Sequence, residues 1–397
     1  MEENTIKVGD FIIVQRQGYT KLHKLKAHGT LSIGSFNVEM DNVVGEKYSD
    51  TFQMKNCPAN KRLFTLEKVD EVSSAKSVTI EKSGVDNRNI TDDGQSQNLT
   101  TEQIDKLKSE ELNSNNIVEK LITNSKTFNS KTEYSQEKYI KKKEKKYFEY
   151  VQIRHPTIRL LATMFYRQDP AKTLGIRIDD LSQIITYSNI QSQGTHLLYD
   201  SGTSGLIPAA LLNQIGRDTT AHLIHIHPGN ECQKSALVAM KFPQEQLDRC
   251  VNVNLYSVLR CFYQNKDSFS DEPVSKKMKI DEEAGPKKAG WQKDNERACR
   301  LLETGVDSLI ITAKEHPVTI VDELVKFLNG GRYLVVFSLS REPLQELYNH
   351  LKEKLDFIYI RIVNNFMRNY QVLPERTHPE VNMTTGGYIL TAFKLVS

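Results

Sequence analysis

The chain has 397 residues, which is too long for one ordinary domain and predicts two domains with connecting segments. Hydrophobic residues make up 38% of the sequence, which is enough to build cores and excludes a protein that is disordered throughout. Charged residues make up 26% but nearly cancel, to a net charge of +3. A nucleic-acid partner therefore cannot be inferred from net charge and would need a local basic surface.

The five cysteines form no CxxC pair, which argues against a disulfide framework or a zinc module and suits a reducing compartment. The polar N-terminus lacks the apolar region of a secretory signal. No apolar run approaches the roughly 20 residues that a membrane span needs. We therefore expect a soluble, intracellular protein.

Residues 1–75 have the pattern of a small β-domain. Short β-rich runs alternate with glycines at hairpin-like intervals. The predicted strands lie at residues 11–16, 21–26, 30–33, 36–40 and 62–69. A closed barrel would leave no unpaired strand edges, and we favour it over an open β-meander packed on a neighbour.

Residues 76–148 are predicted to form a linker and a helical connector. The segment Asp86–Gln97 is polar and rich in turn residues, and Thr100 with Gln103 has the spacing of a helix capping box. Two amphipathic helices follow, with the apolar stripes Ile104 and Leu107, and Ile117, Leu121 and Ile122.

The connector ends in a lysine-rich segment, Lys138–Phe148. Its lysines are Lys138, Lys141, Lys142, Lys143, Lys145 and Lys146. Lysines at this density can neutralise several phosphates of a nucleic acid and release their counterions. The aromatic residues Tyr139, Tyr147 and Phe148 could stack on bases or anchor the helix to the core. A solvated lysine face is the alternative, and the residues alone do not decide.

From residue 149 to 397, β-rich runs alternate with amphipathic helices. Strands are predicted at residues 148–153, 196–202, 222–229, 251–256, 307–313, 332–339, 357–363 and 387–395. Helices are predicted at residues 157–166, 179–190, 205–216 and 317–329. This alternation predicts a mostly parallel, doubly wound α/β sheet, and the last two strands, with no helix between them, predict an antiparallel pair.

The predicted α/β domain is interrupted at about residues 263–297. This stretch is charged and poor in large apolar residues, so we expect a disordered surface insertion. Its basic residues resemble a nuclear localisation signal and favour the nucleus. They are Lys276, Lys277, Lys279, Lys287 and Lys288.

The segment Asp200–Gly205 occupies the position at which such sheets bind nucleotide cofactors, between a strand and the following helix. An S-adenosylmethionine site usually has the pattern acid-x-Gly-x-Gly-x-Gly. Asp200 and Gly202 fit this pattern, but Ser204 and Leu206 stand at the next two glycine positions. We expect the Leu206 side chain to project into space that the cofactor needs, or at least to prevent close approach of the backbone.

Two further features of a methyltransferase are missing. The next strand ends at His227-Pro228 without a carboxylate for the ribose, and Glu231 comes late for that contact. Adenine-N methyltransferases carry an Asp or Asn at the end of the fourth strand to bind the target base, but here Thr312–Pro317 follows. Three losses together predict a degenerate loop that binds no cofactor in this chain.

The sequence offers no other catalytic group. His225 and His227 share one face of a strand, as a metal pair or as hydrogen-bonded strand histidines, but no third ligand has suitable spacing. Ser201 and Ser204 do not lie in a Gly-x-Ser-x-Gly elbow. We therefore predict no catalytic residue and no metal.

Four segments resemble one family. They are Asp86–Thr100, Glu137–Tyr147, Asn189–Ile190 and, the longest and most specific, Arg368–Val381. In these segments the chain resembles the non-catalytic subunits of eukaryotic tRNA (adenine-N1)-methyltransferases, which modify the T-loop adenosine. The resemblance runs from the linker to the C-terminus, whereas the N-terminal domain matches in character more than in motif.

The resemblance implies a degenerate Rossmann-like methyltransferase fold and a heterotetramer of two catalytic and two non-catalytic subunits. The catalytic partner would hold S-adenosylmethionine. This chain would contribute a scaffold and much of the tRNA surface.

The segment between the last two predicted strands is too polar for a core. Arginine can make paired phosphate contacts and tyrosine can stack on an unpaired base. Alternatively, Tyr370, Val372 and Leu373 pack as a strand and the arginines are solvated. With the resemblance we predict RNA contact, with Arg361 and Arg332 as weaker candidates. The predicted RNA-binding residues are Arg368, Tyr370, Arg376, His378, Lys142, Lys143 and Lys145.

Two other functions stay open on the sequence. An active RNA methyltransferase with an unusual cofactor loop would bind S-adenosylmethionine in the isolated chain. A nuclear assembly or translation factor that uses the fold for protein contacts alone would lose RNA at moderate salt and keep its protein partner.

Overall fold

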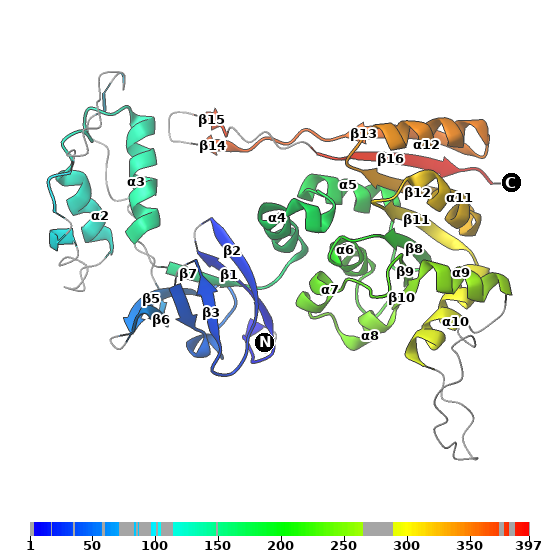
Figure 1. The fold of residues 1–397 in the computed structure, drawn as a ribbon, viewed down its shortest axis with the longest axis horizontal. Coiled ribbons are helices and arrows are strands. Elements are labelled where there is room, and N and C mark those ends of the chain that lie inside the picture. Colours follow the sequence, from blue (N-terminus) through cyan, green and yellow to red (C-terminus); the bar gives the residue numbers. More distant parts are fainter. Residues whose placement is uncertain are drawn as a thin grey trace, which may run out of the picture. The chain divides into compact units, whose positions relative to one another are not determined.

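The computed structural model describes most of the chain, which divides into two compact units, Met1–His155 and Pro156–Ser397 (Figure 1). The described residues are 4–16, 18–34, 36–57, 60–70, 83–84, 86, 97–100, 102–104, 114–147, 150–264, 289–372, 377–380 and 386–396. Each unit is described by itself below.

The first unit contains a nearly closed β-barrel. Its strands are β1 (Phe11–Arg16), β2 (Tyr19–Lys24), β3 (Thr30–Ile33), β4 (Phe36–Glu39), β5 (Thr51–Cys57), β6 (Asn60–Val69) and β7 (Tyr150–Arg154). They pair in the order β2-β1-β7-β5-β6-β4-β3, so β2 and β3 are the two ends of the sheet. The ammonium of Lys21 on β2 donates to the carbonyl oxygen of Ser32 on β3 at 2.9 Å. The predicted barrel is confirmed.

The barrel differs from the prediction in two strands. β5 was not predicted, although Phe52 and Met54 on it are buried in the barrel core. β7 was predicted in the second domain, but it pairs antiparallel with both β1 and β5. Val151 and Ile153 are buried in the same core, so this unit extends to His155. The domain limits expected at residues 75 and 149 therefore both fall inside the first unit.

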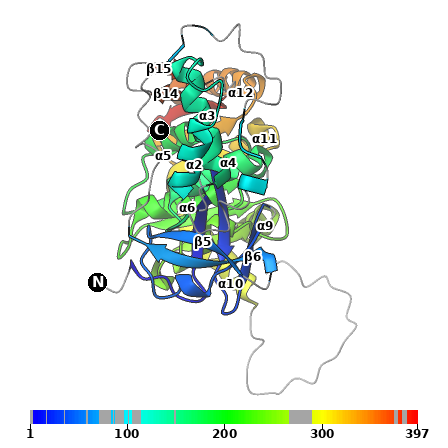
Figure 2. The same ribbon diagram turned by 90° about the vertical axis from the view of Figure 1, so that its left-hand side faces the viewer.

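Two helices of the connector pack on one another in the first unit. They are α2 (Ser114–Thr123) and α3 (Glu133–Tyr147), and they lie side by side in Figures 1 and 2. Their shared core is Ile117, Val118, Leu121, Ile122, Phe128 and Ile140. The predicted capping box is confirmed, because the Thr100 N–H donates to Gln103 Oε1 at 3.0 Å and the Gln103 N–H donates to Thr100 Oγ1 at 3.3 Å.

The second unit is built on a seven-stranded sheet. Its strands are β8 (Thr195–Asp200), β9 (His222–His227), β10 (Cys250–Asn254), β11 (Val306–Thr312), β12 (Leu328–Ser338), β13 (Phe357–Asn364) and β16 (Tyr388–Lys394). The order is β10-β9-β8-β11-β12-β16-β13. The first five strands are parallel, and β16 is antiparallel to both β12 and β13. The predicted doubly wound sheet and its antiparallel terminal pair are confirmed.

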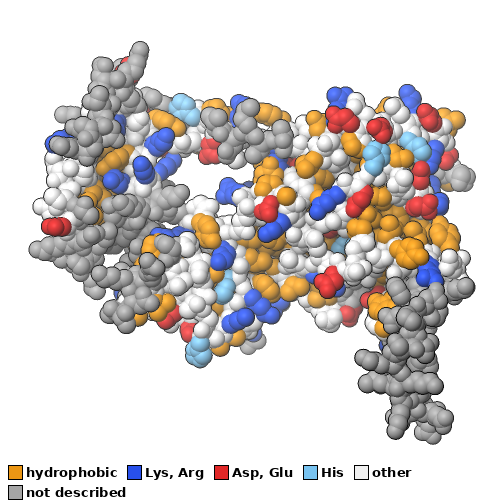
Figure 3. All heavy atoms as spheres, viewed as in Figure 1, with side chains coloured by type: hydrophobic (Ala, Val, Ile, Leu, Met, Phe, Trp, Pro, Cys, Tyr) orange, Lys and Arg blue, Asp and Glu red, His pale blue; other side chains and the backbone are white. Residues whose placement is uncertain are grey.

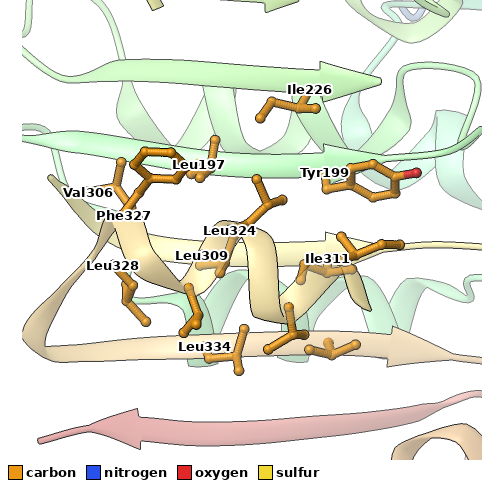
Figure 4. Close-up of a cluster of buried hydrophobic side chains, with 14 of the residues drawn as sticks. Leu197, Tyr199, Ile226, Val306, Leu309, Ile311, Leu324, Phe327, Leu328 and Leu334 are labelled. Atoms are coloured by element: carbon orange, nitrogen blue, oxygen red, sulfur yellow. The ribbon is translucent and has the colours of Figure 1, made fainter. Parts of the chain in front are cut away.

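Helices cover both faces of this sheet. They are α4 (Ile158–Gln168), α5 (Ile178–Ser188), α6 (Leu206–Ile215), α7 (Ser235–Ala239), α8 (Gln244–Asp248), α9 (Leu255–Gln264), α10 (Gly290–Glu303), α11 (Pro317–Leu324) and α12 (Glu342–Glu353). In Figure 4, α11 lies in front of the sheet and earlier helices lie behind it. Leu324 of α11 packs with Leu309 and Leu334 of two strands, in the buried cluster that the figure shows. Among the described residues, no helix is long and apolar enough to cross a membrane.

The predicted insertion at residues 263–297 is shorter than expected at both ends. α9 continues to Gln264 and α10 begins at Gly290. Asn295 and Ala298 of α10 are buried, so the polar residues around them lie on a helix that packs against the domain. The five lysines of the predicted nuclear signal lie outside the described residues.

A small hairpin separates β13 from β16. It consists of β14 (Tyr370–Val372) and β15 (Thr377–Pro379), which pair antiparallel in a sheet of their own. Within the second unit this hairpin lies beyond the ends of β13 and β16 (Figure 1). The chain therefore leaves the main sheet after β13 and returns to it at β16.

Candidate functional site

The turn from β8 into α6 is the expected cofactor position. It lies at the carboxyl end of a central strand, where the order of the sheet reverses and such folds bind ligands. The buried carboxylate of Asp200 accepts the N–H groups of Gly202 and Thr203, each at 3.0 Å. The hydroxyl of Thr203 donates to the other carboxylate oxygen at 2.5 Å. Asp200 thus binds its own loop.

Residues that follow β9 cover this glycine loop. The Ser204 N–H donates to Gln233 Oε1 at 2.8 Å, and the Ala236 N–H donates to the Ser204 carbonyl oxygen at 3.1 Å. Gly205 has φ +76, and a Cβ atom there would lie 2.8 Å from the Gln233 carbonyl oxygen. The two backbone segments are therefore packed together where a cofactor would need to approach.

Side chains also occupy the space beside Gly202. A Cβ atom on this glycine would lie 3.5 Å from both Gln233 Nε2 and Lys314 Nζ. Leu206, which we expected to block the cofactor, instead starts α6 and is fully buried. The Leu206 side chain therefore packs inside the domain, and the groups beside the glycine are those of Gln233 and Lys314. Only the fold brings these residues, from two other loops, to the motif.

The carboxyl end of β9 carries a buried histidine in place of a ribose-binding carboxylate. His225 Nδ1 lies 2.9 Å from Asn252 Oδ1 and 3.3 Å from Cys232 Sγ. Its Nε2 atom is 3.8 Å from Asp200 Oδ2. Burial lowers the pKa of His225 and raises the pKa of the Cys232 thiol to about 12. The cluster is therefore held by a neutral imidazole and a protonated thiol, not by a reactive thiolate.

The second histidine of the predicted pair is bound to the backbone. His227 Nδ1 lies 2.8 Å from the Gly229 carbonyl oxygen, and the His225 and His227 rings are 6.2 Å apart. In the part of the chain that the structure describes, no three His, Cys, Asp or Glu residues are arranged to hold a metal ion. The contacts of this pair are those of hydrogen-bonded strand histidines.

The end of β11 also departs from an adenine-binding site. Thr312 is buried, and its hydroxyl donates to the Tyr199 carbonyl oxygen at 3.3 Å. The Lys314 N–H donates to Ser201 Oγ at 2.7 Å, so this strand end is tied to the glycine loop. The Tyr199 hydroxyl donates to Glu315 at 3.4 Å. Thr312, the last residue of β11, carries neither a carboxylate nor an amide, and the carboxylate of Glu315 in the following loop is held by Tyr199.

The hairpin β14–β15 presents its predicted RNA-binding residues to solvent. Arg368, Tyr370 and His378 are exposed, and the Arg368 guanidinium lies 5.4 Å from the ring centre of exposed Phe366. Tyr370 does form a strand, as the alternative held, but it pairs with Pro379 only in a two-stranded sheet. The side chain of Val372 is 74% exposed, so this strand is no part of a core. The predicted residue Arg376, and Leu373, lie outside the described residues.

Helix α3 carries the lysine-rich segment on one exposed face. Lys138, Lys141 and Lys142 are exposed and follow helical spacing, which places them side by side. Figure 3 shows Lys and Arg side chains gathered over α3. We call Lys138, Lys141 and Lys142 the lysine face. The first two were not among our predicted contacts, although helical periodicity would have grouped them with Lys142.

Two further residues of α3, Tyr139 and Lys143, make contacts within the first unit. The Tyr139 ring packs 5.6 Å from that of Phe128, and the Lys143 ammonium lies 5.0 Å from the Tyr139 ring centre. Tyr139 therefore anchors the helix, in favour of the second interpretation of these aromatics. The Lys143 ammonium therefore contacts this ring. The side chain of Lys145 lies outside the described part of the structure.

The weaker arginine candidates differ from one another. Arg332 forms an ion pair with Asp307 at 2.8 Å, so its charge is already neutralised. Arg361 is exposed on β13 and lines a groove of about 730 Å³ together with Arg341 and Tyr348. No sequence pattern indicated Arg341, because this residue lines the same groove as Arg361 only through the packing of α12 on β13.

Known proteins resemble this chain in sequence and in fold. The relative from Mus musculus named tRNA (adenine(58)-N(1))-methyltransferase non-catalytic subunit TRM6 is 29% identical, over 100% of this chain and 89% of the relative. The protein of the same name from Dictyostelium discoideum is 28% identical, over 99% of this chain and 80% of the relative.

The solved structure of an S-adenosylmethionine-dependent O-methyltransferase from Thermotoga maritima has a similar fold. Its TM-score is 0.52 at 13% identity, and the match covers 99% of this chain and 96% of that one. The likeness therefore concerns the fold alone. A model of the Gcd10p family matches residues 5–287, which is more than half of the sequence, and the chain belongs to that family.

Proposed function

We propose that this chain is a non-catalytic, tRNA-binding subunit of the methyltransferase that forms N1-methyladenosine in the T-loop of tRNA. One observation carries the non-catalytic role: the glycine loop lies at the correct end of β8, but residues of this chain fill the space beside it. The printed names of the mouse and Dictyostelium relatives support the substrate and the role.

The methyl donor is then held by another chain. A catalytic partner with an intact glycine loop and a ribose-binding carboxylate would bind S-adenosylmethionine, and the complex would contain two copies of each subunit. Support for this comes from the loop of this chain, where Asp200 accepts the N–H groups of its own turn. The mass of the co-purified complex by light scattering tests the stoichiometry, and any mass other than that of a two-plus-two assembly contradicts it.

RNA contact rests on two exposed sets of residues. The first is the hairpin set Arg368, Tyr370 and His378, and the second is the lysine face of α3. Guanidinium and ammonium groups in solvent are suited to phosphates, and an exposed tyrosine is suited to an unpaired base. Lys143 and Lys145 stay predictions of lower rank, the first because it is held over Tyr139.

The deciding experiment is a methyl-transfer assay on tRNA with this chain alone, with its catalytic partner alone and with the two co-expressed. Activity only in the mixture supports an obligatory non-catalytic subunit. Activity in this chain alone, together with stoichiometric binding of S-adenosylmethionine, would show that the loop opens and holds the cofactor, and the proposal would fail. Loss of tRNA at moderate salt with the protein partner retained would instead support a role in protein contacts alone.

We also propose that the protein works in the nucleus, on the basis of the lysines within residues 276–288. Replacing Lys276, Lys277 and Lys279 with alanine should move a fluorescent fusion to the cytoplasm. Replacing Lys138, Lys141 and Lys142 serves as the control, because it removes the same charge elsewhere. An unchanged nuclear signal in the first variant contradicts this assignment.

A further inference from the structure

A pocket of about 380 Å³ opens at the carboxyl ends of β11 and β12, beside the closed glycine loop. Its apolar walls include Leu174, Phe337 and Leu339, and its polar groups include Lys314, His316 and Ser340. The volume falls in the range of sites for small ligands, and apolar walls with a few convergent polar groups are typical of such sites.

One wall of the pocket depends on a specific backbone geometry. Gly175 has φ +65, and a Cβ atom there would lie 2.6 Å from Leu339 Cδ2. Leu339 can therefore lean over the chain only because residue 175 has no side chain. The side chain of Leu339 is still 55% exposed, so it borders the opening and is not part of the core.

The pocket carries charged groups of both signs, and Lys314 is the one positioned to bind a phosphate. Glu315 accepts the Tyr199 hydroxyl at 3.4 Å, and His316 Nε2 lies 3.0 Å from Glu346 Oε2. Lys314 is exposed and, among the described residues, no carboxylate lies within ion-pair distance of its ammonium. The pocket thus offers the Lys314 ammonium, the Glu315 carboxylate held by Tyr199, and a serine hydroxyl beside apolar walls.

We propose that this pocket holds one unpaired nucleotide of the bound tRNA, without any chemistry on it. The apolar walls contact the faces of the base, the hydroxyl and imidazole groups meet its edge, and Lys314 binds a phosphate oxygen. Proteins that read RNA hold splayed-out bases in such settings of apolar and polar groups. The inference rests on the proposed tRNA-binding function and adds to it a site on the main sheet, apart from the hairpin and α3.

Filling the pocket tests the inference in the co-purified complex. Leu339→Trp places a larger side chain at the opening, and Leu355→Trp, at a residue 79% exposed outside the pocket, is the matched control. We expect Leu339→Trp to weaken the affinity for an unmodified tRNA transcript about tenfold and the control to leave it unchanged. Dimethyl sulfate probing of the bound transcript should show the protection of one unpaired base lost in Leu339→Trp, with the other protections kept.

Removing the charge gives an independent variant. Lys314→Ala should reduce the same protection and weaken tRNA binding several-fold, whereas Lys293→Ala, at an exposed lysine of α10, should not. If both pocket variants leave the tRNA affinity and the protections unchanged while Arg368→Ala still weakens binding, the assignment of the pocket is overturned. Release of the catalytic subunit by Leu339→Trp would also overturn it, in favour of a protein contact. Failure of the unaltered complex to bind tRNA would instead remove the proposed function itself.

Discussion

The glycine loop and the β14–β15 hairpin lie in the same unit, but polar side chains are buried in the loop and exposed at the hairpin. In the loop, Asp200 is buried and its oxygens accept the N–H groups of Gly202 and Thr203 and the hydroxyl of Thr203. At the hairpin, Arg368, which precedes β14, and Tyr370, the first residue of β14, are exposed to solvent. Polar groups that are satisfied internally stabilise the fold, whereas exposed ones are available to a ligand. The difference indicates that the polar groups of the loop stabilise the fold, and it supports the proposal that the hairpin binds RNA.

The largest expected effect is on stability, from Asp200→Ala. The substitution leaves the Gly202 and Thr203 N–H groups without their buried acceptor, so we expect the free energy of unfolding to fall by about 3 kcal/mol. Denaturant titration measures it, and Asp200→Asn, which keeps one acceptor oxygen, should lose less. A variant that stays stable but loses methyl transfer in the complex would show that the loop still acts in function, and the comparison would break.

The second effect is on RNA affinity, from the double variant Arg368→Ala with Tyr370→Ala. We expect tRNA binding by the complex to weaken about thirtyfold, because a phosphate contact and a stacking contact are lost together. The free energy of unfolding should change by less than about 0.5 kcal/mol, since both side chains are exposed. Arg300→Ala, at an exposed arginine of α10, is the control. Equal tRNA affinity in the variant and in the control would refute the hairpin assignment.

A smaller effect is expected from the lysine face of α3. Replacing Lys138, Lys141 and Lys142 with alanine should weaken tRNA binding and reduce the slope of log affinity against log salt by about 2 to 3, because each phosphate contact releases counterions. A control replaces Lys55 and Lys68 of the barrel, whose ammonium groups pair with carboxylates, as that of Lys141 does with Glu137 at 3.5 Å. An unchanged salt slope in the triple variant would mean that these lysines form only a solvated face.

The smallest effect concerns pH and the buried histidine beside the loop. Burial lowers the folded-state pKa of His225 below its ordinary value of 6.5, so the unfolded chain binds a proton more readily. Its contribution to stability is complete above pH 6.5 and is lost as the pH falls below that value. Burial also lowers the pKa values of His196 and His227. Unfolding measured at about pH 7.5 and pH 5.5 should show a smaller loss in His225→Asn than in the exposed control His316→Asn. Equal losses would contradict the assignment.

Much of the fold was predictable because it depends on local patterns. The runs of apolar residues at β8, β11 and β12 identified buried parallel strands, and the spacing of Thr100 and Gln103 identified a helix start. Ser204 and Leu206 stand where the pattern requires glycines, and this alone indicates a degenerate loop. These features need only a few neighbouring residues, whose side chains set the local backbone and burial.

Other features could not be predicted, because they depend on residues that are distant in the sequence. The alternating pattern of Val151 and Ile153 fits a strand of either sheet, and only pairing with β1 and β5 assigns β7 to the barrel. Gln233 and Lys314 have no motif of their own, yet they stand beside Gly202. Lys143 is a weaker candidate for RNA contact because its ammonium lies over the Tyr139 ring, and this contact forms only in the folded chain.

The sequence by itself determined the order of the elements, the loss of the glycine pattern and the positions of the basic and aromatic candidates. Periodicity and turn chemistry act over short stretches, so one sequence is enough to see them. The tertiary structure alone decided which groups close the glycine loop, which sheet contains β7, and that the hairpin stays outside the core. Each of these depends on which distant side chains pack together, because burial and hydrogen bonding are settled only when the whole chain has folded.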